Sequence, residues 1–71
     1  MVAGRVKWFS DVKGFGFIIV DGEPEDVFVH FRVIEMAGRK TLVNDQKVEL
    51  EYERTEKGPF ATKVIPLNKE E

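Results

Sequence analysis

The sequence of 71 residues contains no cysteine, only one histidine and no long hydrophobic run. Without cysteine the chain can form neither a disulfide nor a thiolate metal site. His30 has no cluster of carboxylates around it, so we expect no zinc site and no cofactor. No apolar run approaches the ~18 residues of a membrane span, and residues 1–5 lack the apolar region of a signal peptide. A cytoplasmic protein without membrane contact is therefore expected.

The length allows a single domain over residues 1–71, in which residues 66–71 are expected to fray. The formal charge is −2, from 11 basic and 13 acidic residues, which argues mildly against a nucleic-acid partner. The charges are unevenly distributed, however. Residues 1–20 contain Arg5, Lys7 and Lys13 against Asp11 alone, whereas residues 21–26 contain four acidic side chains. One face can therefore be positive although the whole chain is acidic.

Turns that contain glycine or proline separate short runs rich in valine, isoleucine and aromatic residues. These runs cover residues 5–10, 15–20, 27–30, 47–54 and 60–65. Residues 31–36 could add one helical turn at most. The pattern predicts an all-β fold, a small five-stranded antiparallel Greek-key barrel, which is a fold that binds oligonucleotides or sugars. A six-stranded SH3-like barrel is the alternative.

Six of the eight aromatic residues lie between Trp8 and Phe31. Side chains alternate across a strand, and the core requires the aliphatic residues Ile18, Val20, Val27 and Val29. This alternation places Phe15, Phe17, Phe28 and His30 on the outer face, beside Lys13. An exposed apolar patch marks an interaction site, and unpaired bases stack on flat rings while lysines meet the phosphates. The pattern therefore predicts binding of single-stranded nucleic acid.

The same alternation leaves two aromatic positions open. Trp8 shares a face with Val6, so it is buried with Val6 unless a β-bulge or a bend intervenes. Phe31 shares a face with Val27 and Val29, so it belongs to the core unless the chain turns after His30.

Three segments resemble the cold-shock proteins: residues 4–9 (GRVKWF), 13–18 (KGFGFI) and 27–31 (VFVHF). The second and third are similar to the two ribonucleoprotein motifs of that family. Lys40-Thr41-Leu42 and residues 58–61 (GPFA) continue the likeness, which extends from Gly4 to about Val64.

This resemblance implies an oligonucleotide-binding (OB) barrel of the cold-shock type and an exposed Trp8, hence a bulge in the first strand. It implies low-preference binding of single-stranded RNA and DNA, and a role as an RNA chaperone or as a regulator of transcription or translation under cold stress. The implied platform consists of Lys7, Trp8, Lys13, Phe15, Phe17, Phe28, His30 and Phe31.

Some positions depart from the family pattern. Arg39 replaces the usual phenylalanine, although a guanidinium plane can also stack on a base. Phe60 replaces a commonly polar residue and either extends the platform or contacts a partner. Lys57, in the loop before the last strand, is a weaker phosphate contact. A monomer is expected, with a weak homodimer as the alternative because Ile19 and Phe60 are predicted to be exposed.

Other interpretations compete with this one. Phe15, Phe17 and Phe28 could fill the core of a barrel with another register, and residues 21–26 are expected to form a solvated acidic turn. An enzyme is not supported, because no Ser-His-Asp set and no phosphate-binding loop is present. A small barrel that docks an extended peptide is the rival function, but its groove does not require Lys7 and Lys13 beside the rings.

Overall fold

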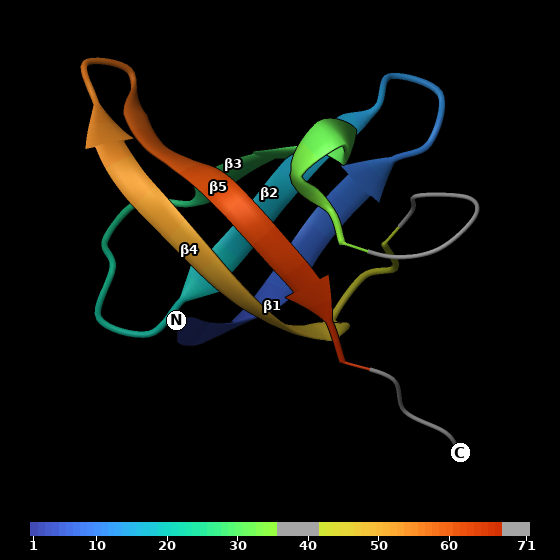
Figure 1. The fold of residues 1–71 in the computed structure, drawn as a ribbon, viewed down its shortest axis with the longest axis horizontal. Coiled ribbons are helices and arrows are strands. Elements are labelled where there is room, and N and C mark those ends of the chain that lie inside the picture. Colours follow the sequence, from blue (N-terminus) through green and yellow to red (C-terminus); the bar gives the residue numbers. More distant parts are fainter. Residues whose placement is uncertain (36–41, 68–71) are drawn as a thin grey trace.

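The computed structural model of the protein describes residues 1–35 and 42–67 (Figure 1). Its strands are β1 (Val2–Ser10), β2 (Phe15–Val20), β3 (Val27–His30), β4 (Lys47–Thr55) and β5 (Gly58–Pro66). One 3₁₀ turn, η1 (Phe31–Val33), follows β3. All five predicted strands are present, and β1 and β5 are longer than predicted. No helix within the described ranges is long and apolar enough to cross a membrane.

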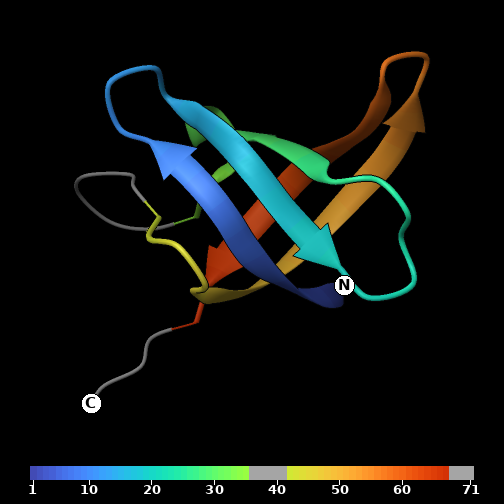
Figure 2. The same ribbon diagram turned by 180° about the vertical axis from the view of Figure 1, so that it is seen from behind.

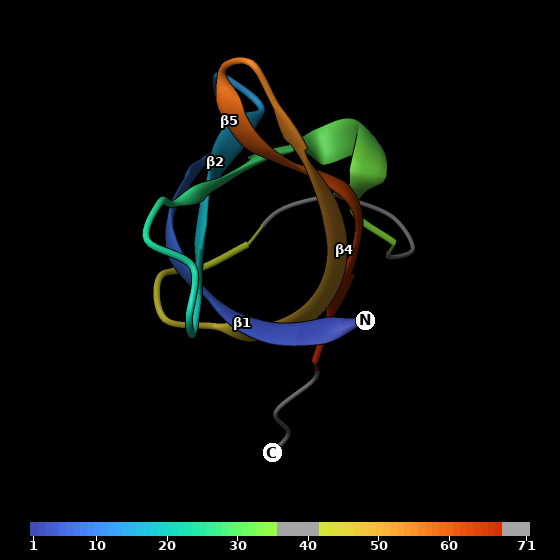
Figure 3. The same ribbon diagram turned by 90° about the vertical axis from the view of Figure 1, so that its left-hand side faces the viewer.

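The strands close into a barrel in the order β1-β2-β3-β5-β4. Figure 3 shows the strands arranged in a ring. Four neighbouring pairs are antiparallel, whereas β3 pairs with β5 in parallel through Phe28 and Phe60. The predicted all-β, five-stranded barrel is confirmed, and the six-stranded alternative is wrong for the part of the chain described. The parallel pair departs from the purely antiparallel barrel that was predicted.

The core is aliphatic. Its buried hydrophobic residues are Val6, Ile18, Val20, Val27, Val29, Ile34, Leu42, Val48, Leu50, Ala61 and Val64. In β2 and β3 every second residue is buried and the residues between them are only partly covered. This is the predicted alternation, and it leaves no place in the core for the phenylalanines of these two strands.

A bulge in β1 resolves the position of Trp8. Val6 pairs with Ile18 and Trp8 pairs with Phe17, so the register shifts between Val6 and Trp8. Val6 is fully buried, Lys7 and Trp8 both face outward, and Phe9 packs against the core. The bulge that the resemblance implied is therefore present, and simple alternation is wrong at this point because one extra residue is inserted into the pairing.

Gly16 lies on β2 opposite this irregular part of β1. A Cβ atom at Gly16 would lie 2.2 Å from the Trp8 carbonyl oxygen and 2.7 Å from Phe9 Cα. Only a residue without a side chain allows the two backbones to approach so closely.

The chain stays paired further than expected at its C-terminal end. Pro66 pairs with Val48 as the last residue of β5, and the Leu67 N–H donates a hydrogen bond of 3.0 Å to the Lys47 carbonyl oxygen. β4 therefore holds the backbone of residues 66 and 67, the first two residues of the tail that was expected to fray. Residues 68–71 lie outside the described part of the chain.

Candidate nucleic-acid interface

Five aromatic side chains form one continuous group on the outer surface. This ring cluster consists of Trp8 from β1, Phe15 and Phe17 from β2, Phe28 from β3 and Phe60 from β5. Its neighbouring ring centroids are 4.8–6.0 Å apart, which is within the range of favourable ring contacts. Strands β1, β2 and β3, which carry four of the rings, lie toward the viewer in Figure 2.

The strand register explains why these rings meet. Trp8 lies opposite Phe17 in the β1–β2 pair, Phe17 lies opposite Phe28 in the β2–β3 pair, and Phe28 lies opposite Phe60 across the parallel pair. Side chains of directly opposed residues on one face are close enough to touch. A row of rings therefore crosses four strands.

The rings are accessible, although each shields its neighbours. Trp8 is 37% exposed and Phe60 is 39% exposed, whereas Phe15, Phe17 and Phe28 are half-buried. The alternative in which these three phenylalanines fill the core is wrong, because Ile18, Val27 and Val29 occupy it. Phe60 packs on Phe28 at 4.8 Å, so it extends the ring cluster onto β5.

His30 and Phe31 lie where β3 passes into η1. His30 has extended backbone angles, and its Nδ1 accepts a hydrogen bond of 3.3 Å from the Arg32 N–H. Its ring lies 4.6 Å from that of Phe31, which is 43% exposed. The chain turns directly after His30, so Phe31 leaves the inward face that alternation assigned to it.

The β1–β2 turn supports the Phe31 ring. Gly14 has a φ of +80°, and a Cβ atom on it would lie 2.7 Å from Phe31 Cδ2. The Phe31 N–H also donates to the Gly14 carbonyl oxygen at 2.9 Å. Glycine is therefore required at position 14 for two reasons. It adopts the positive φ without strain, and it leaves room for the Phe31 ring that packs on it.

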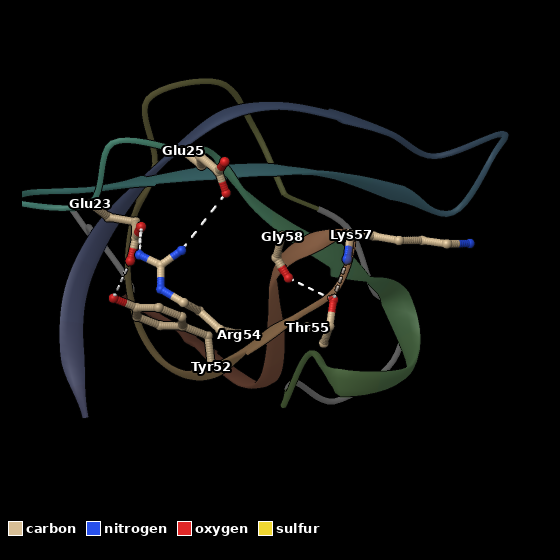
Figure 4. A network of polar contacts seen from close by, with 7 residues as sticks. All are labelled: Glu23, Glu25, Tyr52, Arg54, Thr55, Lys57 and Gly58. Carbon is tan, nitrogen blue, oxygen red and sulfur yellow. Dashed lines mark hydrogen bonds and ion pairs between the residues drawn. The ribbon is translucent and has the colours of Figure 1, made fainter.

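The predicted cations differ in their surroundings. Lys7 forms an exposed ion pair of 2.9 Å with Asp26. Lys13 lies in the exposed β1–β2 turn, where its N–H donates to Ser10 Oγ. Lys57 lies in the exposed β4–β5 turn, and its side chain extends away from the polar network drawn in Figure 4. Arg39, Lys40 and Thr41 lie outside the described residues, so the stacking role expected of Arg39 stays a prediction.

The acidic loop, residues 21–26, is largely solvated as the sequence suggested, but Glu23 is an exception. The Glu23 side chain is only 6% exposed. Its carboxylate accepts a hydrogen bond of 3.0 Å from the Tyr52 hydroxyl and a second bond from Arg54 (Figure 4). Glu25 lies 3.8 Å from the same guanidinium. The loop is therefore attached to β4, because a phenol and a guanidinium supply donors that a buried carboxylate needs.

This contact also changes the chemistry of Tyr52. The hydrogen bond to Glu23 raises the pKa of the Tyr52 phenol above its ordinary value, since the phenol is held as a donor beside a carboxylate. Sequence reasoning missed the pair. The available signal was a tyrosine at an inward strand position, because such a hydroxyl usually finds a hydrogen-bond partner.

Within residues 1–35 and 42–67, no group of three or more histidine, aspartate or glutamate side chains could hold a metal ion. What the surface offers is a set of accessible flat rings with amino groups at its border.

Comparison with known proteins gives a consistent result. A sequence model of the 'Cold-shock' DNA-binding domain matches residues 2–67. The cold shock-like protein CspD of Haemophilus influenzae is 49% identical over 67 residues, which cover 94% of this chain and 93% of that protein. The major cold shock protein CspA of Bacillus cereus is 56% identical over 66 residues, covering 93% and 97%. The cold shock-like protein CspE of Escherichia coli is 50% identical over 66 residues, covering 93% and 96%.

Proposed function

This chain belongs to the 'Cold-shock' DNA-binding domain family, a family of nucleic-acid-binding proteins that are not enzymes, and we propose that it uses the ring cluster to bind single-stranded RNA and DNA. In this proposal unpaired bases stack on the ring cluster and on His30 and Phe31. Phosphates contact Lys7, Lys13 and Lys57, and Arg39 adds a further stacking plane.

The observation that carries the proposal is the position of the rings outside an aliphatic core. Five touching aromatic side chains lie on the surface, although the core is built without them. Stacking of one base on such a ring contributes about 1–3 kcal/mol and tolerates any base, because every base has a π face. Bases in a duplex are covered by their neighbours, so a flat platform selects unpaired strands with low sequence preference.

The ion pair between Lys7 and Asp26 is compatible with a phosphate contact. Both side chains are exposed, and exposed pairs contribute only about 0–1 kcal/mol to stability. A phosphate can therefore replace Asp26 at little cost, while Asp26 keeps the ammonium group beside the rings in the free protein.

A cellular role follows from selective binding to one state of RNA. A protein that binds unpaired RNA and not duplex RNA shifts the equilibrium toward the unpaired form. We propose that this shift underlies an RNA chaperone role in the cytoplasm, and regulation of transcription or translation, in the response to cold.

Trp8 provides the test, because it is the only tryptophan of the chain and lies in the ring cluster. A short pyrimidine-rich oligonucleotide should quench its fluorescence, and a duplex of the same sequence should not. Phe28→Ala should weaken binding by about 1–3 kcal/mol. Val43→Ala, which shortens an exposed apolar side chain outside the ring cluster, is the control and should bind normally. Unchanged fluorescence at high oligonucleotide concentration would contradict the proposal.

A further inference from the structure

A hollow of about 280 Å³ lies on the outer surface beyond the ring cluster. Residues from β1, β2, the loop after β2, β4 and the segment after β5 line it, among them Ala3, Arg5, Ile19, Asp21, Lys47 and Leu67. It is thus a place where parts of the chain distant in sequence meet. The volume lies just below the range for drug-sized ligands, so it has room for a single small unit.

The hollow continues the outward face of β2. Phe15, Phe17 and Ile19 are the outward residues of this strand, and outward neighbours lie roughly 7 Å apart along a strand. Trp8 is paired with Phe17, and Arg5 is paired with Ile19, the next outward position. A strand of nucleic acid that leaves Trp8 and Phe17 along β2 therefore reaches the hollow.

Positive charge also continues in this direction. Arg5 and Lys7 are both exposed on β1, and Lys47 lies opposite Arg5 on the neighbouring strand β4. Arg5 contacts Asp45 at 3.6 Å with both side chains exposed, a contact weak enough for a phosphate to replace. Lys47 makes no ion pair with any residue that the structure describes.

The remaining walls suit a base. Ile19, Leu67 and Ala3 supply apolar surface. Asp21 is the one acidic residue among those that line the hollow. A carboxylate repels a phosphate but accepts a hydrogen bond from the amino group of a base.

We propose that this hollow is an additional nucleotide subsite, which holds the nucleotide that continues past Trp8 and Phe17. The base packs against Ile19 and Leu67, and its phosphate lies between Arg5 and Lys47. This inference rests on the proposed function, because it lengthens the surface that the bound strand follows.

The test compares oligodeoxycytidines, whose bases carry the amino group that Asp21 can bind, of about four and about eight nucleotides, at the lower end of the site sizes of OB folds. Trp8 fluorescence reports the binding of both oligonucleotides. The double variant Arg5→Gln with Lys47→Gln should bind the short oligonucleotide as the unmodified protein does and bind the long one more weakly. For the long one, the slope of log affinity against log salt should become shallower by about 1.4, since each phosphate contact on a single strand contributes about 0.7.

Two further variants sharpen the result. Ile19→Thr keeps a β-branched side chain on the strand but removes apolar surface, so it too should weaken only the long oligonucleotide. Lys63→Gln removes one positive charge, as each single variant Arg5→Gln or Lys47→Gln does, at a residue that does not line the hollow, and should leave the difference between the two lengths unchanged. Each single variant, Arg5→Gln or Lys47→Gln, should shift the slope by about half as much.

Several results would overturn the subsite while leaving the proposed function intact. One is a loss of affinity in the double variant that is equal for the short and the long oligonucleotide. Another is a loss of affinity for the long oligonucleotide in Lys63→Gln that equals the loss in a single variant of Arg5 or Lys47. A change of molecular mass in Ile19→Thr on sedimentation would instead assign the hollow to a contact between copies of the chain. If no oligonucleotide quenches Trp8 even in the unmodified protein, the proposed function itself fails.

Discussion

At the level of single residues, Trp8 depends on its neighbours for its position on the surface. Its own strand alternation points it inward with Val6, and the bulge between these two residues turns it outward. Gly16, on the opposite strand, provides the space in which the bulged backbone lies. A functional side chain is thus placed by a backbone irregularity and by a residue without a side chain.

Replacement of Gly16 by alanine should therefore destabilise the barrel by about 1–3 kcal/mol or more, because the new Cβ would meet backbone atoms of β1. Urea unfolding followed by Trp8 fluorescence measures the loss. Gly22→Ala is the control: Gly22 has a φ of +84° but nothing within 4 Å of a Cβ, so only the backbone penalty of about 1 kcal/mol is expected. Equal losses in the two variants would show that the close approach at Gly16 is unimportant.

Phe60 allows a second test at this scale. Phe60→Gln removes the outermost ring of the cluster, so oligonucleotide affinity should fall by about 1–3 kcal/mol. The melting temperature should change little, since Phe60 is 39% exposed. Val43→Gln, at an exposed residue outside the ring cluster, should alter neither quantity. Full affinity in Phe60→Gln would mean that this ring does not take part in binding.

At the level of elements, the acidic loop, which leads into β3, contacts β4 and β1, two strands that do not pair with β3. Glu23 binds Tyr52 and Arg54 on β4, and Asp26 binds Lys7 on β1. The loop between β2 and β3 is thereby attached to two other strands. Its acidic composition serves internal contacts, which explains how so many negative charges can lie near a surface proposed to bind phosphates.

The titration of Tyr52 reports on this attachment. Tyr52 is the only tyrosine, so its ionisation can be followed by ultraviolet absorbance, and its pKa should lie above the ordinary value. Because the folded-state pKa is raised, the stabilisation is present below the unfolded pKa of about 10 and disappears as pH rises through the folded pKa. Glu23→Gln should lower the Tyr52 pKa, whereas Glu56→Gln, which has no contact with Tyr52, should not. If Tyr52 had the same pKa in Glu23→Gln as in the unmodified protein, this result would argue against the hydrogen bond.

At the level of the whole molecule, the distribution of charge matters more than its sum. The formal charge is −2, yet Lys7 on β1, Lys13 in the β1–β2 turn and Lys57 in the β4–β5 turn are all exposed. Several acidic residues are engaged with cations, as Asp26 is with Lys7 and Glu23 is with Arg54. An acidic protein can therefore still present a surface that attracts phosphates.

Salt dependence tests this arrangement. If three lysines neutralise phosphates of a short single strand that covers only the ring cluster, log affinity should fall with log salt at a slope of roughly −2. Titrations of Trp8 fluorescence at several salt concentrations give the slope, and Lys13→Gln should make this slope shallower by about 0.7. A slope near zero would favour the rival function, docking of an apolar extended peptide.

The sequence by itself determined which strands form and which of their residues face inward. Alternation with a period of two, together with the need for an aliphatic core, placed Ile18, Val20, Val27 and Val29 inside. It therefore placed Phe15, Phe17 and Phe28 outside. These assignments succeed because they depend on residues close together in the chain, and the resemblance to a known family supported them with motifs in the same order.

Only the tertiary structure decided which distant residues meet. Phe60 joins Phe28 because β3 and β5 pair in parallel, Glu23 is covered because Tyr52 and Arg54 of β4 lie beside it, and the hollow exists because β1, β2 and β4 converge. Local alternation did not determine the exposure of Trp8 either, since a register shift leaves no signature in that pattern, and only the family resemblance implied it. Closure of the barrel sets all of these contacts, and closure depends on the register of every strand pair at once.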